Sequence, residues 1–503
     1  MGESCQIKYS LAAQGCNPLR QTRFGSERNQ HPKPITFHEG VSVPTPSHIN
    51  NLLVFTNSQG IEARGTLLKL SRTTIVFEVY NPYSIVQLSE VLHELKIFRG
   101  EQPVYQGKAV VSNLMNTGLM LVVSATLVES WSDLAESIKR KRDLGKEVDN
   151  FLLDWQESQK LQPGYILAVG EFRSFLSALS SWLGQVELNK ESELSSKMLL
   201  DKLYQPIAHQ LNKILKTFEY EASKVASHEL ELYKIFAQQN LHPLIMTSPF
   251  AHRTFHKPLG YAGDYAMVNM IWQNEYEGPT IYAQLINKLQ LHFDAAEAHR
   301  NRINVLTERL IQTCEKARAL GRPAKILNIG CGPAIEIQNF IKTYPLLEFA
   351  EFDLLDFNPE TLANTEKQIN LALQYSKQKP KLDFILKSVH TLLKQTVSKK
   401  IHSENHQLYD FVYCAGLFDY LSDKACAQLL KIFHLWLLPG GVTLATNVHP
   451  NNSAFHWMEH LLEWHLIYRD ENNMRKLTPH IGEQIVYSDK TGINVFLEIQ
   501  KHE

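Results

Sequence analysis

The sequence lacks the features that mark several common classes of protein. Its 503 residues include six cysteines, and none of them forms a Cys-x-x-Cys pair. This spacing favours reduced cytosolic thiols, Cys331 and Cys414 among them, over disulfides or zinc ligands, and we expect no metal site. No apolar stretch reaches the ~18 residues that a membrane-spanning helix requires, so we expect no integral membrane segment.

The chain also lacks an excess of charge of either sign. Its 51 basic and 52 acidic residues cancel, and this balance disfavours nucleic acid or an anionic membrane surface as a partner. The first residues, Met1-Gly2-Glu3-Ser4-Cys5-Gln6, hold no apolar signal core, and Gln6 stands where a myristoylation site has Ser or Thr. We therefore expect a cytoplasmic protein and leave open whether it forms a homodimer.

What the sequence does contain is a succession of differently patterned regions, because a chain of this length is too long for one core. Short alternating strands at regular spacing predict a small barrel. A helical period follows it, and we interpret its apolar residues as core faces of amphipathic helices. In order, the expected regions are a flexible tail (1–35), a β-barrel (36–130), a helical region (131–245), a lid with connecting helices (246–320) and an α/β domain (321–503).

The most informative stretch is 325–336, in which an apolar run breaks at Gly330-x-Gly332. It predicts a buried parallel strand that ends in a tight turn, where a ligand can approach the backbone. A second strand-like stretch ends at Asp356. A glycine turn after one strand and a carboxylate at the tip of the next are typical of a site for adenosine, because the acid binds the ribose hydroxyls. A nicotinamide fingerprint would need a third glycine where this chain has Ile335.

The turn Gly330-Cys331-Gly332-Pro333-Ala334 resembles motif I of class I S-adenosylmethionine-dependent methyltransferases. A strand over 409–416 and the turn Leu438-Pro439-Gly440-Gly441 are also similar to that family. The resemblance implies a Rossmann-like methyltransferase sheet and S-adenosyl-L-methionine as cofactor. The expected fold is therefore α/β, with this sheet preceded by the helical region and the small N-terminal β-barrel that the patterns predict. The cofactor-binding residues that it implies are Gly330, Cys331, Gly332, Asp356, Phe357, Ser388, Val389, Ala415 and Gly416.

The elements around these motifs can be placed as well. We expect a helix from about Asp423 to Leu437 to end at the 438–441 turn, just before a strand that runs from Val442 to Asn447. Two final strands, near 484–488 and 493–501, form a hairpin. In the methyltransferase family such a hairpin closes the sheet with one antiparallel strand.

A helix over about 280–320 carries Arg300 and Arg302 just before the first strand of the sheet. Two residues this close point to different helix faces, so both cannot face the cofactor. We predict that Arg300 pairs with the methionine carboxylate of the cofactor by a bidentate hydrogen bond. The alternative is that both are solvated helix charges.

Residues 252–276 crowd glycines, cationic groups, tyrosines and an aspartate into one segment. One interpretation is a tight turn in which Asp264 caps a helix that begins at Tyr265. The other is a lid over the cofactor that presents donors such as Tyr261 to the substrate, and the two are compatible.

The segments 257–265 (KPLGYAGDY), 298–302 (AHRNR), 327–333 (LNIGCGP) and 418–423 (FDYLSD) together resemble a family described as 3-hydroxypalmitic acid methyl ester biosynthesis proteins. This resemblance implies methyl transfer to the carboxylate of a small molecule or fatty acid. An ionised carboxylate needs no general base. We therefore expect residues that position the acceptor. The candidates are catalytic Tyr261, Tyr265 and His449, and substrate-binding His256, Asp264, Asn269, Phe418 and Tyr420.

Two other functions stay open. An N- or O-methyltransferase of another metabolite would more often need a base, and His449 or His456 could serve. A signalling scaffold with an inactive methyltransferase domain is the alternative of a different class, although the intact Gly330, Gly332 and Asp356 argue against it.

The predicted barrel resembles a PilZ domain around Gly65 to Phe77. That family's motif for cyclic di-GMP has two arginines, an Asp or Asn, a Ser and a Gly, and this chain keeps only Ser71 of the second half. A clamp for phosphates without its arginine pair loses its bidentate donors. We therefore expect a degenerate PilZ-like barrel that does not bind cyclic di-GMP.

Overall fold

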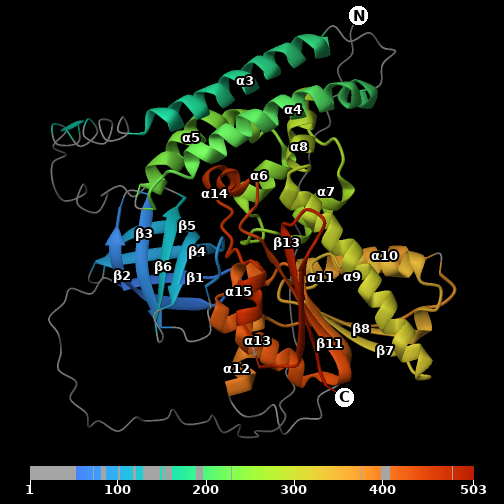
Figure 1. Ribbon diagram of the computed structural model, residues 1–503. Coiled ribbons are helices and arrows are strands. Elements are labelled where there is room, and N and C mark those ends of the chain that lie inside the picture. The colour runs from blue at the N-terminus through green and yellow to red at the C-terminus, as the bar shows by residue number, and fades with distance from the viewer. Residues whose placement is uncertain are drawn as a thin grey trace, which may run out of the picture. The chain divides into compact units, whose positions relative to one another are not determined.

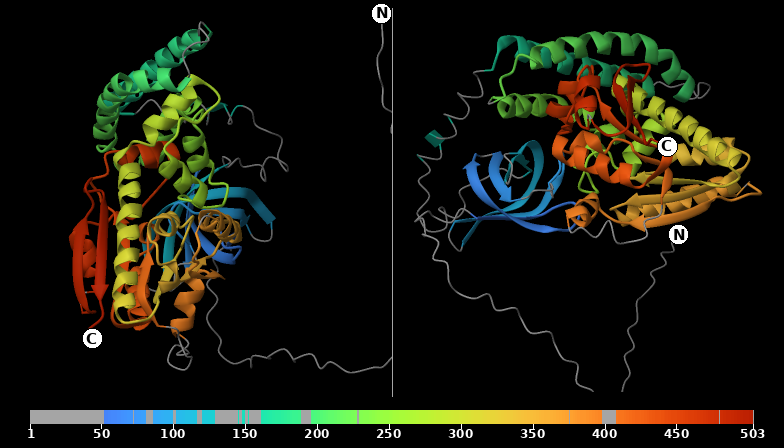
Figure 2. Two further views of the ribbon diagram at one scale, coloured as in Figure 1. Left: turned by 90° about the vertical axis from the view of Figure 1, so that its right-hand side faces the viewer. Right: turned by 60° about the horizontal axis from the view of Figure 1, so that its bottom comes forward.

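The computed structural model (Figures 1 and 2) describes the part of the chain that carries the predicted barrel strands, most helices and the α/β domain. All of these residues belong to one compact unit, 49–503. The predicted tail (1–35), the first residues of the predicted barrel (36–51) and most of 131–160 lie outside them. The described residues are 52–71, 73–80, 86–99, 102–116, 120–128, 145, 148–149, 152, 161–188, 196–227, 229–374, 376–397, 408–478 and 480–502.

Six antiparallel strands close into the barrel that the alternating pattern predicted. Around the barrel they follow the order β1-β2-β3-β6-β5-β4, and β4 pairs again with β1. Every second side chain points inward, so that Phe55 and Phe77 meet in the interior with ring centroids 5.5 Å apart. The strands are β1 (Leu52–Thr56), β2 (Glu62–Leu70), β3 (Thr74–Tyr80), β4 (Val91–Arg99), β5 (Gln102–Asn116) and β6 (Met120–Leu127).

Long helices follow the barrel and share one hydrophobic core. Phe172 and Phe218 pack edge to face in this core, and Trp457, from a much later helix, packs on Phe172. The helices that contribute are α3 (Pro163–Leu188), α4 (Ser196–Ala222), α5 (Leu230–Ile245), α8 (Ile281–Gln290) and α14 (Phe455–Leu462).

The prediction of a single helix over 280–320 is wrong, because the helix is interrupted between α8 and α9 (Asp294–Ala319). The break occupies Leu291 to Phe293, whose backbone N–H groups bond to carbonyls of the last turn of α8. It turns Phe293 inward, where its ring lies 5.7 Å from that of Trp457. The buried aromatic contact thus replaces the helical continuity that the periodicity suggested.

A seven-stranded sheet forms the α/β domain, in the order β12-β13-β11-β10-β7-β8-β9. Strands β11, β10, β7, β8 and β9 are mutually parallel, and β13 runs antiparallel to both β11 and β12. The predicted terminal hairpin is therefore present. The strands are β7 (Ala324–Ile329), β8 (Ala350–Asp356), β9 (Lys381–Leu386), β10 (Tyr409–Cys414), β11 (Leu437–Val448), β12 (Glu483–Ser488) and β13 (Asn494–Gln500).

Helices cover both faces of this sheet. Along β10, Phe411 and Tyr413 pack into the core under α9, whereas Val412 and Cys414 pack into the core on the opposite face. The sheet is therefore buried on both sides, as parallel sheets generally are. The first face carries α9, α10 (Ile335–Thr343) and α11 (Pro359–Leu373), and the second carries α12 (Val389–Val397), α13 (Asp423–Leu435) and α15 (Glu471–Lys476), with the short 3-10 turns η1 (Leu347–Phe349) and η3 (Phe418–Tyr420) between elements.

The predicted boundary between α13 and the next strand is also wrong. The helix ends at Leu435, and β11 already begins at Leu437, which pairs with Tyr409. Gly440 lies in the left-handed region at φ 73° and its N–H bonds to the carbonyl of Lys501. The glycines thus form a bulge within the strand and not a turn before it.

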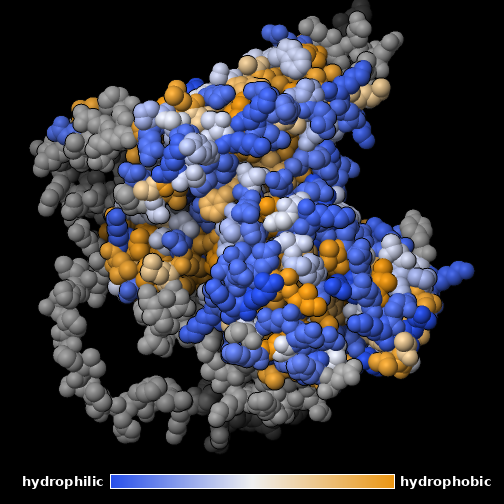
Figure 3. All heavy atoms as spheres, viewed as in Figure 1, coloured by the Kyte–Doolittle hydropathy of each residue, from blue (hydrophilic) through white to orange (hydrophobic). Residues whose placement is uncertain are grey.

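The surface is mixed in polarity. Figure 3 shows a mostly hydrophilic face with apolar residues between, some of them over the barrel. Leu68 and Met115 of the barrel strands are exposed apolar side chains. Among the described helices, none combines the length and the apolar character that crossing a membrane requires.

Candidate cofactor and substrate site

The turn between β7 and α10 leaves open space above two glycines. Gly330 and Gly332 have φ values of 67° and 52°, in the region that side chains avoid. A Cβ at either position would meet no atom within 4 Å. The turn is anchored because the N–H groups of Gly330 and Cys331 both donate to the carbonyl of Leu355, at the end of β8. This backbone can be approached closely by a ligand.

Asp356 is the last residue of β8 and lies beside that turn. Its Oδ2 accepts a hydrogen bond from the N–H of Gly332 at 3.1 Å, and its Oδ1 accepts one from the N–H of Asn358 at 3.0 Å. Burial raises the pKa of this carboxyl, and the backbone donors oppose that shift. The side chain is thus fixed in orientation next to the open turn.

Two adjoining cavities meet at these residues. The first has a volume of about 150 Å³ and the second about 100 Å³. Asp356 and Phe357 line the second cavity only. Residues that line both are Gly263, Gly330, Gly332, Ala415, Gly416 and Tyr420.

The first cavity has a polar side built around Arg302 of α9. The guanidinium lies against Gly416, where a Cβ would be 3.1 Å from Nη1, and it contacts the ring of His299. Burial lowers the pKa of Arg302, and the nearby carboxylates of Asp419 and Glu336 act in the opposite direction. The guanidinium of Arg302 therefore lies near two buried carboxyl groups, and all three side chains line the first cavity.

Both acids are held by the fold. Oδ1 of Asp419 accepts from the N–H of Val448 at 2.7 Å, and burial raises the pKa of this carboxyl to about 6. Oε1 of Glu336 accepts from the hydroxyl of Tyr413 at 2.7 Å and from the amide of Asn328 at 3.0 Å. Burial raises the pKa of Glu336 as well. Together, the guanidinium of Arg302 and these two carboxyl groups can hold a ligand that carries a negative and a positive charge.

The rest of the first cavity is an apolar chamber between helices of the lid region and α14. Part of its lining comes from α6 (Pro249–His256) and α7 (Tyr265–Gln273). The apolar side chains that line the chamber are Phe250, Met267, Val268, Ile271, Phe293, Ile303, Leu306, Trp457, Met458, Leu462, Trp464 and Leu466. An apolar body fits this chamber better than a strongly polar one.

Tyr420 stands where the two cavities meet. Its hydroxyl accepts a hydrogen bond from the indole N–H of Trp464 at 2.9 Å. The same hydroxyl would lie 2.9 Å from a Cβ on Gly263, so the lid segment passes directly over it. Of the residues predicted to bind substrate, Tyr420 is the one that the structure places at the chamber.

The two tyrosines predicted to be catalytic lie elsewhere. Tyr261 and Tyr265 line the second cavity and not the apolar chamber. The hydroxyl of Tyr261 is 3.3 Å from Thr361 Oγ1 and its ring packs on Phe357, with centroids 5.1 Å apart. Tyr265 donates to Glu360 at 2.8 Å. Their positions outside the apolar chamber argue against the donor role to the acceptor that the sequence suggested.

The structure places Arg302, and not Arg300, in the cavity. Arg300 donates from Nη1 to the carbonyls of Ile271 and Leu291 and forms an ion pair with Glu297 at 2.6 Å. These contacts fasten the break between α8 and α9. The prediction that Arg300 reaches the cofactor is corrected accordingly.

Several other predicted substrate residues also have structural partners away from the cavities. Asp264 caps α7 by accepting from the N–H groups of Ala266 and Met267, and it pairs with Arg253 at 2.8 Å. This agrees with the interpretation of the segment as a capped turn. His256 stacks on His252, and Asn269 lines neither cavity.

His449, His456 and Phe418 lie outside both cavities too. His449 is 3.6 Å from a carboxylate oxygen of Glu471, and the side chain of Phe418 is fully buried in the core. The imidazole that does line the first cavity is that of His299. Burial and the neighbouring Arg302 hold its pKa well below the usual range.

All of the predicted cofactor residues on the strand ends except Ser388 line one of the cavities. Ser388 instead caps α12 by accepting from the N–H of Thr391, while Val389 and Lys387 line the second cavity. Within the described ranges, no cluster of three or more His, Cys, Asp or Glu side chains is arranged to hold a metal ion.

Comparison with known proteins gives distant similarities. No protein-family model matches the sequence. The chain is 24% identical over 143 residues to the uncharacterized protein RP028 of Rickettsia prowazekii and 25% identical over 148 residues to a malonyl-[acyl-carrier protein] O-methyltransferase of Halalkalibacterium halodurans. These alignments cover 28% and 29% of this chain, and the chain spans about half the length of both relatives.

Among solved structures, the chain is similar to a possible exported protein from Bordetella parapertussis. The TM-score is 0.37 and the identity 14%, with 68% of this chain and 96% of that chain covered.

Proposed function

We propose that this chain is an S-adenosylmethionine-dependent methyltransferase that methylates the carboxylate of a small molecule or fatty acid. The observation that carries the proposal is a single continuous site. In it, Asp356 lines one cavity, Arg302 and the apolar chamber line the other, and the open glycine turn borders both.

The chain's own residues fit the parts of this cofactor. Asp356 is oriented to accept from the ribose hydroxyls, and its position at the tip of β8 is where such sheets bind them. Arg302 can bind the methionine carboxylate, and the buried acids Glu336 and Asp419 complement the ammonium and sulfonium charges. When bound, the cofactor supplies a methyl group that is already activated by its sulfonium leaving group.

The chamber then has to align the acceptor and exclude water. Its apolar walls suit a hydrocarbon body, and Tyr420 stands at the junction where the acceptor must meet the methyl group. A carboxylate is ionised near pH 7 and needs no proton removed. This agrees with the position of His449 and His456 outside both cavities.

His299 favours a second candidate, methylation of a phenol or amine. Its imidazole lines the first cavity and is the ring that could take a proton from such an acceptor, although burial and the neighbouring Arg302 lower its pKa and so weaken it as a base. The two candidates differ in their dependence on that side chain, because carboxylate methylation by a His299→Gln variant would continue.

The test is mass spectrometry of a lipid and metabolite extract incubated with the full chain and S-adenosylmethionine that carries an isotopically labelled methyl group. A labelled fatty acid methyl ester that forms with the wild type and not with Asp356→Ala supports the first candidate. A labelled amine or aryl ether supports the second. An extract in which no compound gains the label, although the chain is folded, overturns the proposal.

A further inference from the structure

The second cavity is not formed by the α/β domain alone. Two glutamines of the barrel reach it, Gln59 from the turn between β1 and β2 and Gln87 from the segment before β4. Residues at the ends of β8 and β9 line the same cavity. The barrel therefore forms part of the wall of the proposed cofactor site.

Gln59 has an unused hydrogen-bond acceptor. Its Oε1 is buried and has no partner among the described residues. Buried polar atoms are almost always paired, because an unpaired one loses its bonds to water without replacement. Because Gln59 also lines the second cavity, a ligand there that donates a hydrogen bond could satisfy this acceptor after a small rotation of the side chain.

The turn that carries Gln59 is rigid. The side chain of Asn57 accepts from the N–H groups of Gln59 and Ile61, at 3.0 and 2.8 Å. The carboxylate of Glu90, which is fully buried, accepts from the N–H of Ser58 at 2.8 Å with one oxygen. Its other oxygen accepts from the N–H of Gln87 at 2.7 Å. One carboxylate thus positions both cavity-lining glutamines.

The residues on either side of Glu90 attach the barrel to the rest of the site. The N–H of Val91 donates to the carbonyl of Gly260 in the lid segment at 2.7 Å. The hydroxyl of Ser89 donates to the carbonyl of His465 at 2.8 Å and accepts from the N–H of the same residue. Gly260 is packed so tightly that a Cβ there would lie 3.0 Å from Nε2 of His93.

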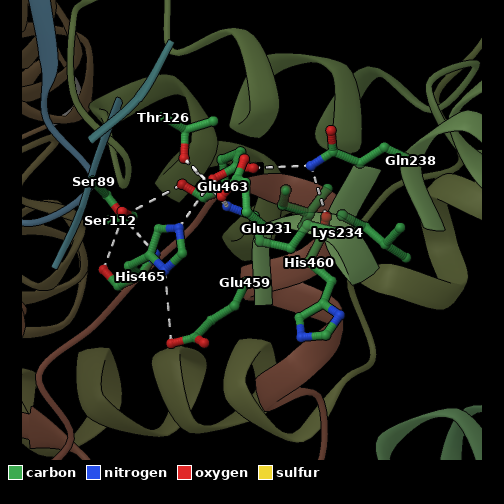
Figure 4. A network of polar contacts seen from close by, with 12 residues as sticks. Ser89, Ser112, Thr126, Glu231, Lys234, Gln238, Glu459, His460, Glu463 and His465 are labelled. Carbon is green, nitrogen blue, oxygen red and sulfur yellow. Dashed lines mark hydrogen bonds and ion pairs between the residues drawn. The ribbon is translucent and has the colours of Figure 1, made fainter. Parts of the chain in front are cut away.

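A buried polar network continues this attachment (Figure 4). His465 bonds to Glu463 at 3.0 Å, and Glu463 pairs with Lys234 of α5 at 2.6 Å. Gln238 donates to the same carboxylate at 2.9 Å. Because a charged buried network is costly to break, it holds the barrel, α5 and the segment after α14 together.

We propose that the barrel forms the adenine end of the cofactor site and that Gln59 recognises the exocyclic amino group of adenine. This inference rests on the proposed function. Asp356 would hold the ribose and Arg302 the methionine end in the first cavity, so the base is left with the second cavity, beside Phe357 and Val389. A glutamine amide matches the edge of adenine, because its oxygen accepts from the amino group and its nitrogen donates to a ring nitrogen.

The experiment compares two ligands by calorimetry on the full chain. S-adenosylhomocysteine carries the amino group, and S-inosylhomocysteine carries a carbonyl in its place. We expect the wild type to prefer the adenosyl compound by about tenfold or more, which is the worth of a lost hydrogen bond that leaves a buried acceptor unpaired. Gln59→Leu should weaken binding of the adenosyl compound by about tenfold and bring the two affinities within about twofold.

Gln106→Leu is the matched control, since Gln106 lies on the same barrel with an exposed side chain. It should leave both affinities unchanged, and thermal unfolding of each variant reports whether the barrel stays folded. If Asp356→Ala loses binding but Gln59→Leu keeps the wild-type preference, the role of the barrel is overturned and the proposed function stands. If the folded wild type binds neither compound, the proposed function fails first.

Discussion

The N–H of Gly332 donates to Oδ2 of Asp356 at 3.1 Å, which ties the turn after β7 to the tip of β8. The two residues belong to separate motifs, and their contact sets the distance between the open backbone and the carboxylate. A ligand that touches both is therefore bound by a prearranged pair, and the cost of ordering them has been met on folding.

Asp356→Ala should weaken S-adenosylmethionine binding at least tenfold. The substitution removes the acceptor for two ribose hydroxyls, and charge-assisted bonds contribute about 1.5–3 kcal/mol each. Calorimetry measures the affinity, and Asp383→Ala, on the exposed face of the adjacent β9, serves as control. An unchanged affinity in the Asp356 variant would remove the cofactor assignment.

Arg302→Lys should reduce cofactor affinity about tenfold, because lysine keeps the charge but loses the planar fork that binds a carboxylate with two bonds. Its matched control is Arg300→Lys. That change disturbs the contacts to Ile271 and Leu291, so it should lower the unfolding temperature and leave the affinity close to the wild type. If the Arg300 variant were the one to lose binding, the placement of the methionine carboxylate would be wrong.

The sequence predicted the parts of the site that depend on local chain geometry. A buried strand followed by Gly330-x-Gly332, and a strand that ends in Asp356, must place those residues at one edge of a parallel sheet. The barrel followed from the same kind of local evidence, the alternation of short strands.

The features of the site that the sequence did not predict depend on how helices and loops pack against each other. Arg300 and Arg302 are two residues apart, and Arg300 is occupied by carbonyls of Ile271 and of Leu291, in a break that the periodicity did not reveal, whereas Arg302 lines the cavity. The role proposed for Gln59 depends on a cavity that it shares with residues some 300 positions later in the chain, such as Asp356. Tyr261 lines the second cavity and not the apolar chamber, and the segment before it is tied to the barrel by the hydrogen bond from the N–H of Val91 to the carbonyl of Gly260.

Tyr420→Phe should lower methyl transfer about tenfold and change cofactor affinity by no more than about twofold. The hydroxyl lies where the chamber meets the second cavity, and its loss leaves the indole N–H of Trp464 without its acceptor. Tyr276→Phe is the matched control, because that hydroxyl bonds to Asp201 and the residue lines neither cavity. Steady-state kinetics with labelled cofactor would refute the assignment if both variants turned over equally.

Lys257 gives the protein a stability that depends on pH. It is the C-cap residue of α6 and is 2% exposed, and its Nζ donates to the carbonyl of Leu462 at 3.2 Å. Burial lowers the pKa of this amine from 10.5 to about 7, although the nearby Glu463 acts in the opposite direction. Between these two values the unfolded chain binds more protons than the folded chain.

The unfolding free energy should therefore gain a contribution that rises with pH from about 7 to about 10.5, at no more than about 1.4 kcal/mol per pH unit. Below pH 7 both states bind the proton, and the contribution is constant. Lys257→Met keeps the apolar stem and removes the titrating group, so its curve should be flatter than that of the wild type over this window. Urea unfolding at several pH values measures both curves. The difference in slope between the two curves of unfolding free energy against pH is the test. The loss of the bond to Leu462 only shifts the whole curve of the variant by a constant. Parallel curves would show that the pKa of the amine does not change on folding.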